Sequence, residues 1–303
     1  MLTDKRIPFK YIFKQIRADV ARVFFFSVSF QLLEWFFAKY IPLVPGLLPT
    51  ILGSAISLIL AFKINQSYDR WWEARKVWGA IVNDSRSLVL QLKGFLEDDL
   101  LGYDAAQEVI RKIGNRQIAW CYSLGQSLRG LNPMANLEHY VSADELAYLR
   151  KHNNKPLALL ALHTEDFKVL RRQDALHSFE HVQLDNTLVR LCDSMGKAER
   201  INSTVFPVTY RMFIHLFIYL FLIVLSLALV ETIGLLELPI LLVFASSFFL
   251  LEKTATYLQD PFRNRPTDTP VTAIARTIEI NIKQLLDEQE VPKPSVPEAF
   301  YLM

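Results

Sequence analysis

The chain has 303 residues, of which 51% are hydrophobic, and its formal net charge is only +2. A charge this small gives no sign of the basic surface that binds nucleic acid, so no nucleic-acid partner is expected. The apolar residues gather into two blocks, at 23–62 and 206–251, with a charged region between them. This two-block pattern favours bilayer-spanning helices with a soluble part over a single globular core.

The first apolar block predicts a transmembrane hairpin at 23–62. Its longest uncharged run, Ile41 to Phe62, would reach about 33 Å as a helix, which is enough to cross a hydrocarbon core of about 30 Å. Prolines and a glycine crowd the start of this run, so we expect the helix to begin near Leu47. The run from Val23 to Ala38 forms the other arm, and the chain is expected to turn between Lys39 and Gly46.

The second apolar block repeats this arrangement at 207–251. Met212 to Val230 contains no Lys, Arg, Asp or Glu, and a short acidic link leads into Leu238 to Leu251. The last run is short for a span, so we expect it to include neighbouring residues or to pack inside an oligomer. The two hairpins together predict four spans.

Lysine and arginine residues predict the orientation, because cytoplasmic loops carry an excess of them. Lysine and arginine residues lie beside one end of each span, whereas the links that join the two spans of each hairpin contain only Lys39. Both termini should therefore be cytoplasmic, in a multi-pass protein of the inner cell membrane. The expected segments are a cytosolic N-terminal segment at 1–22, the first hairpin at 23–62, a cytosolic helical domain at 63–206, the second hairpin at 207–251, and a cytosolic C-terminal helix with an extended tail at 252–303.

The region between the hairpins is predicted to be helical. Apolar residues recur at three- and four-residue spacing in Val82 to Leu96 and in Ala106 to Leu128. Asn132-Pro133 and 153–156 interrupt the pattern as loops. Residues 271–287 form a further amphipathic helix, and strand-like alternation is nearly absent. The fold class is therefore all-α.

Residues 65–79, NQSYDRWWEARKVWG, directly follow the second span. Tryptophan and tyrosine often lie at headgroup depth, which accounts for the rings but not for the charges. On a continuing helix, Asp69 and Glu73 are four residues apart, as are Trp72 and Lys76. This pattern predicts that the span continues into the cytosol and packs there against other helices or subunits.

These residues carry a specific resemblance. Two motifs resemble the bestrophin family of ion channels. One is the segment NQSYDRWWEARKVWGAIVNDSRSL, which follows a span that ends in Phe62. The other is the turn Gln259-Asp260-Pro261-Phe262, which follows the last span. The segment INSTVFPVTYRM before the third span also has a counterpart in that family. The resemblance covers about residues 10 to 290 and is closest to the short bacterial members.

The resemblance implies a homopentamer with one central pore that passes small monovalent ions through the lipid membrane. Its narrow neck of apolar side chains falls here on Ser54, Leu58 and Phe62 of the second span. Residues four apart share a helix face, and apolar rings can gate by dewetting. Ser54 departs from the bulky apolar residue usual in the family, which leaves Leu58 and Phe62 as the expected constriction. Without the resemblance, the same stripe would indicate packing against lipid or another helix.

The family's cytosolic aperture corresponds here to Phe179 or Ser178, and the register stays open. The same place offers an alternative, because His177, Glu180 and His181 fit the H-x-x-E-H pattern of a zinc hydrolase helix. That site needs a third ligand, which the sequence does not identify. The two histidines could instead make the aperture sensitive to pH.

No cofactor is expected. Animal bestrophins bind calcium with acidic residues just after the DPF-like turn, but Arg263 and Arg265 stand in this region. Asp260 and Asp268 alone cannot supply the six or more oxygens that calcium prefers. Outside this region, the two cysteines are far apart and have no metal-binding spacing, so free thiols are expected.

The sign of the permeating ion is not predicted by the sequence. The family includes anion-selective members, and the bacterial branch need not share that preference. Lys63 adjoins the neck but lies about 100° around the helix from Phe62, so its charge decides little. His215 is an ionisable residue inside a span and is either a packed histidine or a functional one.

Overall fold

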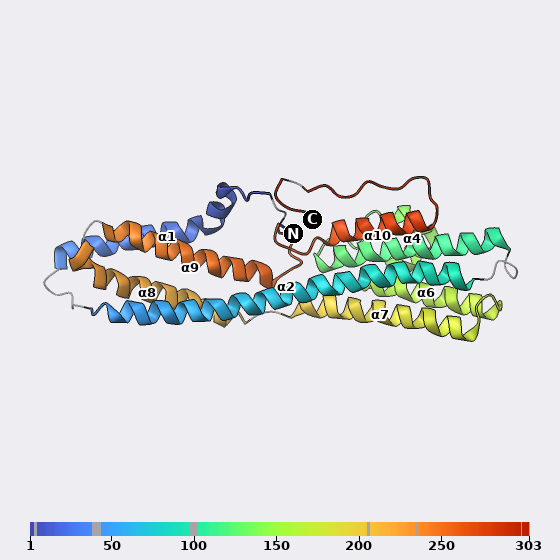
Figure 1. Cartoon of the computed structure of the whole chain (residues 1–303), viewed down its shortest axis with the longest axis horizontal. Helices are drawn as coiled ribbons and strands as arrows, with labels where there is room; N and C mark the ends of the chain where they lie inside the picture. The colour runs from blue at the N-terminus through green and yellow to red at the C-terminus, as the bar shows by residue number, and fades with distance from the viewer. Residues whose placement is uncertain are drawn as a thin grey trace. The chain divides into compact units, whose positions relative to one another are not determined.

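The computed structural model describes residues 1–2, 5–37, 44–96, 102–204, 207–233, 236–297 and 299–302. Within these ranges the regular secondary structure is helical, apart from an isolated antiparallel bridge between Leu2 and Tyr301, which confirms the all-α class. The elements in chain order (Figure 1) are α1 (Phe9–Phe37), α2 (Leu47–Phe95), α4 (Tyr103–Leu128), the 3₁₀ helix η2 (Leu137–His139), α5 (Ala143–Arg150), α6 (Lys155–Arg172), α7 (Ser178–Ser203), α8 (Val208–Ile233), α9 (Glu237–Gln259) and α10 (Val271–Leu285).

The chain divides into two compact units that are discontinuous in sequence. We call Lys5–Trp71 with Val205–Asp260 the apolar unit. Met1–Asp4, Trp72–Thr204 and Pro261–Met303 form the polar unit. Helix α2 contributes its first half to the apolar unit and its second half to the polar unit.

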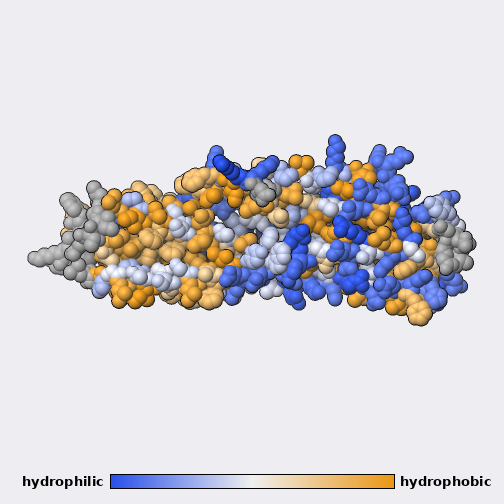
Figure 2. Space-filling view, in the orientation of Figure 1, coloured by the Kyte–Doolittle hydropathy of each residue, from blue (hydrophilic) through white to orange (hydrophobic). Residues whose placement is uncertain are grey.

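In the apolar unit, α9 packs against both α1 and α8 (Figure 1). Buried side chains from α1, α2, α8 and α9 form its core, among them Val23, Ile56, Ile218 and Phe249. Hydrophobic side chains also cover the outside of this unit (Figure 2). An apolar exterior over helices is the pattern required by contact with lipid, where backbone polar groups must be bonded internally.

Three described helices are long and apolar enough to cross a membrane: α2, residues Thr209–Leu229 of α8, and α9. The other expected span, which starts at Val23, lies within α1, and α1 is not among the three. The count of four spans therefore stays a prediction. Residues 39–43 of the expected first turn, as well as the last residue of the expected first span, lie outside the described residues.

Helix α2 begins at Leu47, as expected from the prolines that precede it, and continues without a break to Phe95. The prediction that the helix runs on through 65–79 is confirmed. Within this stretch Trp78 is fully buried in the core of the polar unit. Lys76 and Glu73 form a pair at 2.6 Å whose side chains are 57% and 42% exposed, so these two charges face outward.

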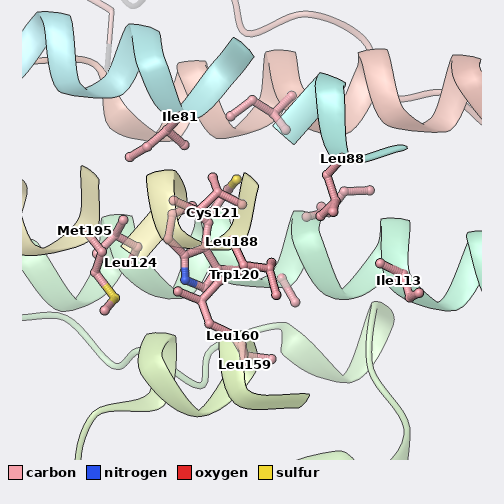
Figure 3. Packing of buried hydrophobic residues seen from close by; sticks show 14 of the residues in the cluster. Ile81, Leu88, Ile113, Trp120, Cys121, Leu124, Leu159, Leu160, Leu188 and Met195 are labelled. Carbon is pink, nitrogen blue, oxygen red and sulfur yellow. The ribbon is translucent and has the colours of Figure 1, made fainter. Parts of the chain in front are cut away.

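The core of the polar unit forms around α4, which packs against α6, α7 and α10. Trp120 of α4 is fully buried among side chains from these neighbours, including Leu159, Leu160 and Leu188 (Figure 3). The three- and four-residue apolar spacing of α4 thus places its hydrophobic side chains toward the surrounding helices.

Local polar residues fix where the shorter helices begin. Ser142 and Glu145 form a capping box at the start of α5. The Asn154 side chain accepts a hydrogen bond from the Leu157 backbone N–H at 3.0 Å. Because α6 begins at Lys155, Pro156 belongs to its first turn and not to the expected loop, a position that tolerates the missing N–H of proline.

Candidate ion-conduction path

The three expected neck residues lie on an exposed side of α2. Leu58 is 59% and Phe62 is 56% exposed, and Ser54 is exposed as well. The Ser54 hydroxyl donates to the Thr50 carbonyl oxygen at 2.8 Å, one turn earlier. The hydroxyl hydrogen of Ser54 is therefore used in a hydrogen bond within the helix. Ser54 is a small side chain on the same side of the helix as two large apolar ones.

The other side of α2 is packed. Ile56, Leu60 and Lys63 are each at most 2% exposed. Gly53 lies so close to α8 that a Cβ atom at this position would be 3.1 Å from the Phe221 ring. The first half of α2 therefore has one side held against its own unit and one side without a partner there.

Lys63 is held by a polar cluster inside the apolar unit. Its Nζ lies 2.8 Å from Oε1 of Glu252 and donates to the Thr256 hydroxyl at 3.2 Å. The other Glu252 oxygen lies 3.3 Å from Nε2 of His215. The expectation that Lys63 points away from the neck agrees with this burial. His215 lies beside the cluster, with 27% of its side chain exposed.

Sequence reasoning missed Glu252 as the partner of Lys63. Each of the two residues directly follows a long apolar run, and their charges are opposite. The matching positions of two opposite charges are the sequence feature that indicates the pair, because a charged residue at the end of a span usually has a partner within the protein. A spacing of 189 residues gives no local pattern that would identify the pair.

The expected cytosolic aperture residues lie at the start of α7, in the polar unit. Phe179 is 81% exposed, whereas the Ser178 hydroxyl accepts a hydrogen bond from Arg171 at 2.9 Å. The ring of His177 stacks against that of Phe179, with centroids 5.6 Å apart. Of the two candidate positions, Phe179 is thus the one with an exposed side chain.

The H-x-x-E-H pattern has a structural role. The Glu180 carboxylate accepts a hydrogen bond at 2.8 Å from the backbone N–H of His177, which precedes α7. The same three-residue spacing is that of a capping box, in which Glu satisfies an otherwise unpaired donor. No group of three or more metal-ligating side chains occurs within the described parts of the chain, so the zinc hypothesis gains no third ligand.

Asp268 holds the turn at 263–268, in the region where no calcium site is expected. This fully buried residue accepts hydrogen bonds from the backbone N–H groups of Arg263 at 2.5 Å and Arg265 at 3.1 Å. Burial raises the pKa of its carboxyl group above the ordinary value, while these two hydrogen bonds oppose the shift. The backbone of the two arginines, which stand where acids were expected, thus supports the turn.

Comparisons with known proteins agree with this geometry. A family model described as "Bacterial/Fungal Bestrophin protein" matches residues 8–284, which confirms the resemblance seen in the motifs. A voltage-dependent anion channel-forming protein of Escherichia coli O157:H7, YneE, is 32% identical over 252 residues, which cover 83% of this chain and 80% of that protein. The similarly named RSc3414 of Ralstonia nicotianae is 30% identical over 254 residues, covering 84% and 81%.

Solved structures show the same fold. The crystal structure of a bacterial bestrophin homologue from Klebsiella pneumoniae superposes with a TM-score of 0.82 and 24% identity, covering 91% of this chain and 100% of that chain. A point variant of that homologue gives 25% identity and the same TM-score of 0.82, covering 90% and 100%. The matched relatives are named as channel-forming proteins and not as enzymes, which removes the support for a zinc hydrolase.

Proposed function

This membrane protein belongs to the bacterial and fungal bestrophin family of ion channels, and we propose that it conducts small monovalent ions along a path lined by α2. The observation that carries the proposal is the unequal packing of that helix. Leu58 and Phe62 are more than half exposed, while Leu60 and Lys63 beside them are buried. Lipid or another subunit can cover an apolar side of this kind. The relationship to bestrophin channels favours self-association of this side around an axis.

In the proposed assembly, five copies of the chain surround one pore, as the family resemblance implies. Ser54, Leu58 and Phe62 then form three stacked rings, because residues at four-residue spacing share a helix face. The Ser54 ring is the wider and wetter one, since its side chain is small and polar. The Leu58 and Phe62 rings form the constriction, which can close by dewetting because a dehydrated ion finds no ligands there.

A second constriction is proposed at the cytosolic end, where Phe179 projects from the first turn of α7. Ser178 is the less suitable candidate, because its hydroxyl is engaged by Arg171. His177 and His181 flank this aperture, and protonation of either would add positive charge to its rim. In this proposal the polar unit and both termini are cytoplasmic, α1 supplies the first of four spans, and the protein lies in the inner membrane.

The names of the relatives favour anions as the permeating species. The experiment is a reversal-potential measurement on purified protein in planar bilayers under a tenfold KCl gradient. A channel permeable only to anions should reverse near the chloride potential, about 59 mV from zero. Reversal at the potassium potential would overturn the anion assignment, and the absence of any current would overturn the channel itself.

The path is tested by Phe62→Ala, which should raise single-channel current by widening the narrowest ring. Phe213→Ala is the matched control, because Phe213 is a similarly exposed phenylalanine on α8, at 51%. Equal currents in the Phe62 variant and the wild type would place the constriction elsewhere. Native mass spectrometry tests the assembly, which should contain five copies of the 35.0 kDa chain.

A further inference from the structure

A pocket of about 460 Å³ lies between α1, α8 and α9 in the apolar unit. Its volume falls within the range of small-molecule sites, about 300–1,000 Å³. The pocket is distinct from the exposed side of α2, since none of the three neck residues lines it. The charged and titratable side chains that line it are Asp19, Arg22, Arg211, His215, Glu252 and Lys253.

The pocket has an excess of positive charge. Asp19 bonds Arg22 at 2.8 Å and lies 3.9 Å from Lys253, so this carboxylate is shared by two cations. The Glu252 charge is offset by the buried Lys63. Arg211 is exposed and has no acidic partner within the described part of the chain. The three lining cations are Arg22, Arg211 and Lys253. With Lys63, which neutralises Glu252 but does not line the pocket, four positive charges are set against two carboxylates, which leaves a net charge of +2 for an anion.

All three helices change from charged to apolar at the level of this pocket. Arg22 is followed by the apolar run of α1, Arg211 by that of α8, and Glu252 directly follows that of α9. Such a boundary marks the depth of the lipid headgroups. Exposed apolar side chains continue from it along two of the helices, including Phe25 at 69%, Met212 at 62% and Leu216 at 59%.

We propose that this pocket binds the phosphoryl group of an anionic phospholipid, with Arg211 and Lys253 as the main phosphate ligands. Arginine binds phosphate oxygens through charge-assisted hydrogen bonds, and basic pockets between membrane helices are suited to anionic headgroups. The exposed apolar side chains beside the pocket offer a surface for the acyl chains, which a free phosphate ion would not use. Arg22 and Asp19 hold the rim in place through their ion pair. The proposal does not depend on the pore assignment.

The test uses the purified full chain in a neutral detergent. Native mass spectrometry counts retained phosphatidylglycerol and phosphatidylcholine when the two lipids compete, and thermal unfolding is followed with each lipid and with inorganic phosphate. The wild type should retain phosphatidylglycerol selectively. The double variant Arg211→Gln/Lys253→Gln should lose affinity by roughly fivefold for each charge removed.

Arg17→Gln is the matched control, because it removes an exposed charge from α1 outside the pocket. This variant should retain phosphatidylglycerol selectively. An equal loss of retention in the control and in the double variant would show that the lipid is attracted by surface charge in general, which would contradict the proposed site. If inorganic phosphate stabilises the wild type, the lipids do not, and the double variant loses this effect, the pocket binds a phosphoryl group of a soluble anion and the lipid assignment is wrong. Equal retention of both lipids by the wild type, with no effect of phosphate, would overturn the proposal.

Discussion

Lys63 of α2 and Glu252 of α9 form a buried ion pair with 2.8 Å between Nζ and Oε1, and both side chains are 1% exposed. Lys63 directly follows Phe62, so the pair fixes the rotation of α2 at the point where its exposed apolar side ends. Buried pairs contribute little net stability, but removing one partner leaves a charge without compensation. We therefore expect the pair chiefly to set the rotation of the helix that carries the proposed neck.

The first prediction concerns this pair. Lys63→Met should destabilise the protein by about 3–5 kcal/mol, because Glu252 would remain buried and charged. Lys63→Met/Glu252→Gln should lose less than the sum of the two single variants, since the uncompensated charge is gone. Thermal unfolding in detergent measures all three.

Lys76→Met is the control for the first prediction. Its partner Glu73 lies 2.6 Å away, but the two side chains are 57% and 42% exposed. An exposed pair of this kind contributes about 0–1 kcal/mol. Equal losses in Lys63→Met and Lys76→Met would show that burial of the first pair has no energetic consequence.

Local patterns in the sequence predicted much of the helical architecture. The start of α2 at Leu47 follows from the prolines before it, and its continuation through 65–79 follows from the four-residue spacing of charges and rings. Both signals act within a few turns of one helix, where sequence spacing and spatial proximity agree.

The partners of buried polar groups could not be predicted in this way. The sequence indicates for Asp268 only a possible role as a calcium ligand, whereas its carboxylate accepts hydrogen bonds from two backbone N–H groups and so holds a turn. The His177 to His181 segment shows a related ambiguity. Histidine and glutamate at this spacing fit both a metal site and a helix start, and only the hydrogen bond from His177 to Glu180 distinguishes the two.

The second prediction concerns the close approach of α2 and α8. Gly53→Leu should destabilise the protein by about 1–3 kcal/mol through overpacking. The added side chain would meet Phe221, which is 3% exposed and already packed edge-on against Phe248 with ring centroids 5.4 Å apart. Thermal unfolding midpoints in detergent measure the effect.

Gly94→Leu is the control for the second prediction, because Gly94 lies on the same helix and, among the described residues, only its chain neighbours and its own helix backbone come within 4 Å of its ideal Cβ position. This variant should be neutral or stabilising by up to about 1 kcal/mol, since leucine is the better helix former. Comparable destabilisation at both glycines would contradict the proposed role of the Phe221 contact.

The third prediction concerns the two free cysteines. Cys121 is fully buried, and burial raises the pKa of its thiol to about 12, against the opposing effect of contacts with Ser85 and Gln117. Cys192 is exposed. Because the thiolate is the reactive form, maleimide at pH 8 should label one thiol per folded chain. Mass spectrometry should show that Cys192→Ser abolishes labelling and that Cys121→Ser leaves it unchanged. Rapid labelling of folded Cys192→Ser protein would refute this assignment.

The fourth prediction is a pH dependence of stability that arises from His163 in α6. This side chain is fully buried, and neither ring nitrogen has a hydrogen-bond partner within the described residues. Desolvation lowers the pKa of its imidazole well below 6.5, and the positive charges of Arg116 and Lys112 act in the same direction. Below pH 6.5 the unfolded chain therefore binds a proton that the folded chain does not, so stability from this group is lost as the pH falls.

Replacing the group isolates its contribution to that pH dependence. His163→Leu removes this titration. The free energy of unfolding of the variant, minus that of the wild type, should therefore increase by up to about 2 kcal/mol as the pH falls from 6.5 to 5. Thermal unfolding of the full chain at pH 8, 6.5 and 5 measures this difference. The comparison cancels the titration of all other groups, which both proteins share. A constant difference across the three pH values would mean that His163 binds its proton as readily in the folded protein as in the unfolded chain, in contradiction to its burial beside two cations.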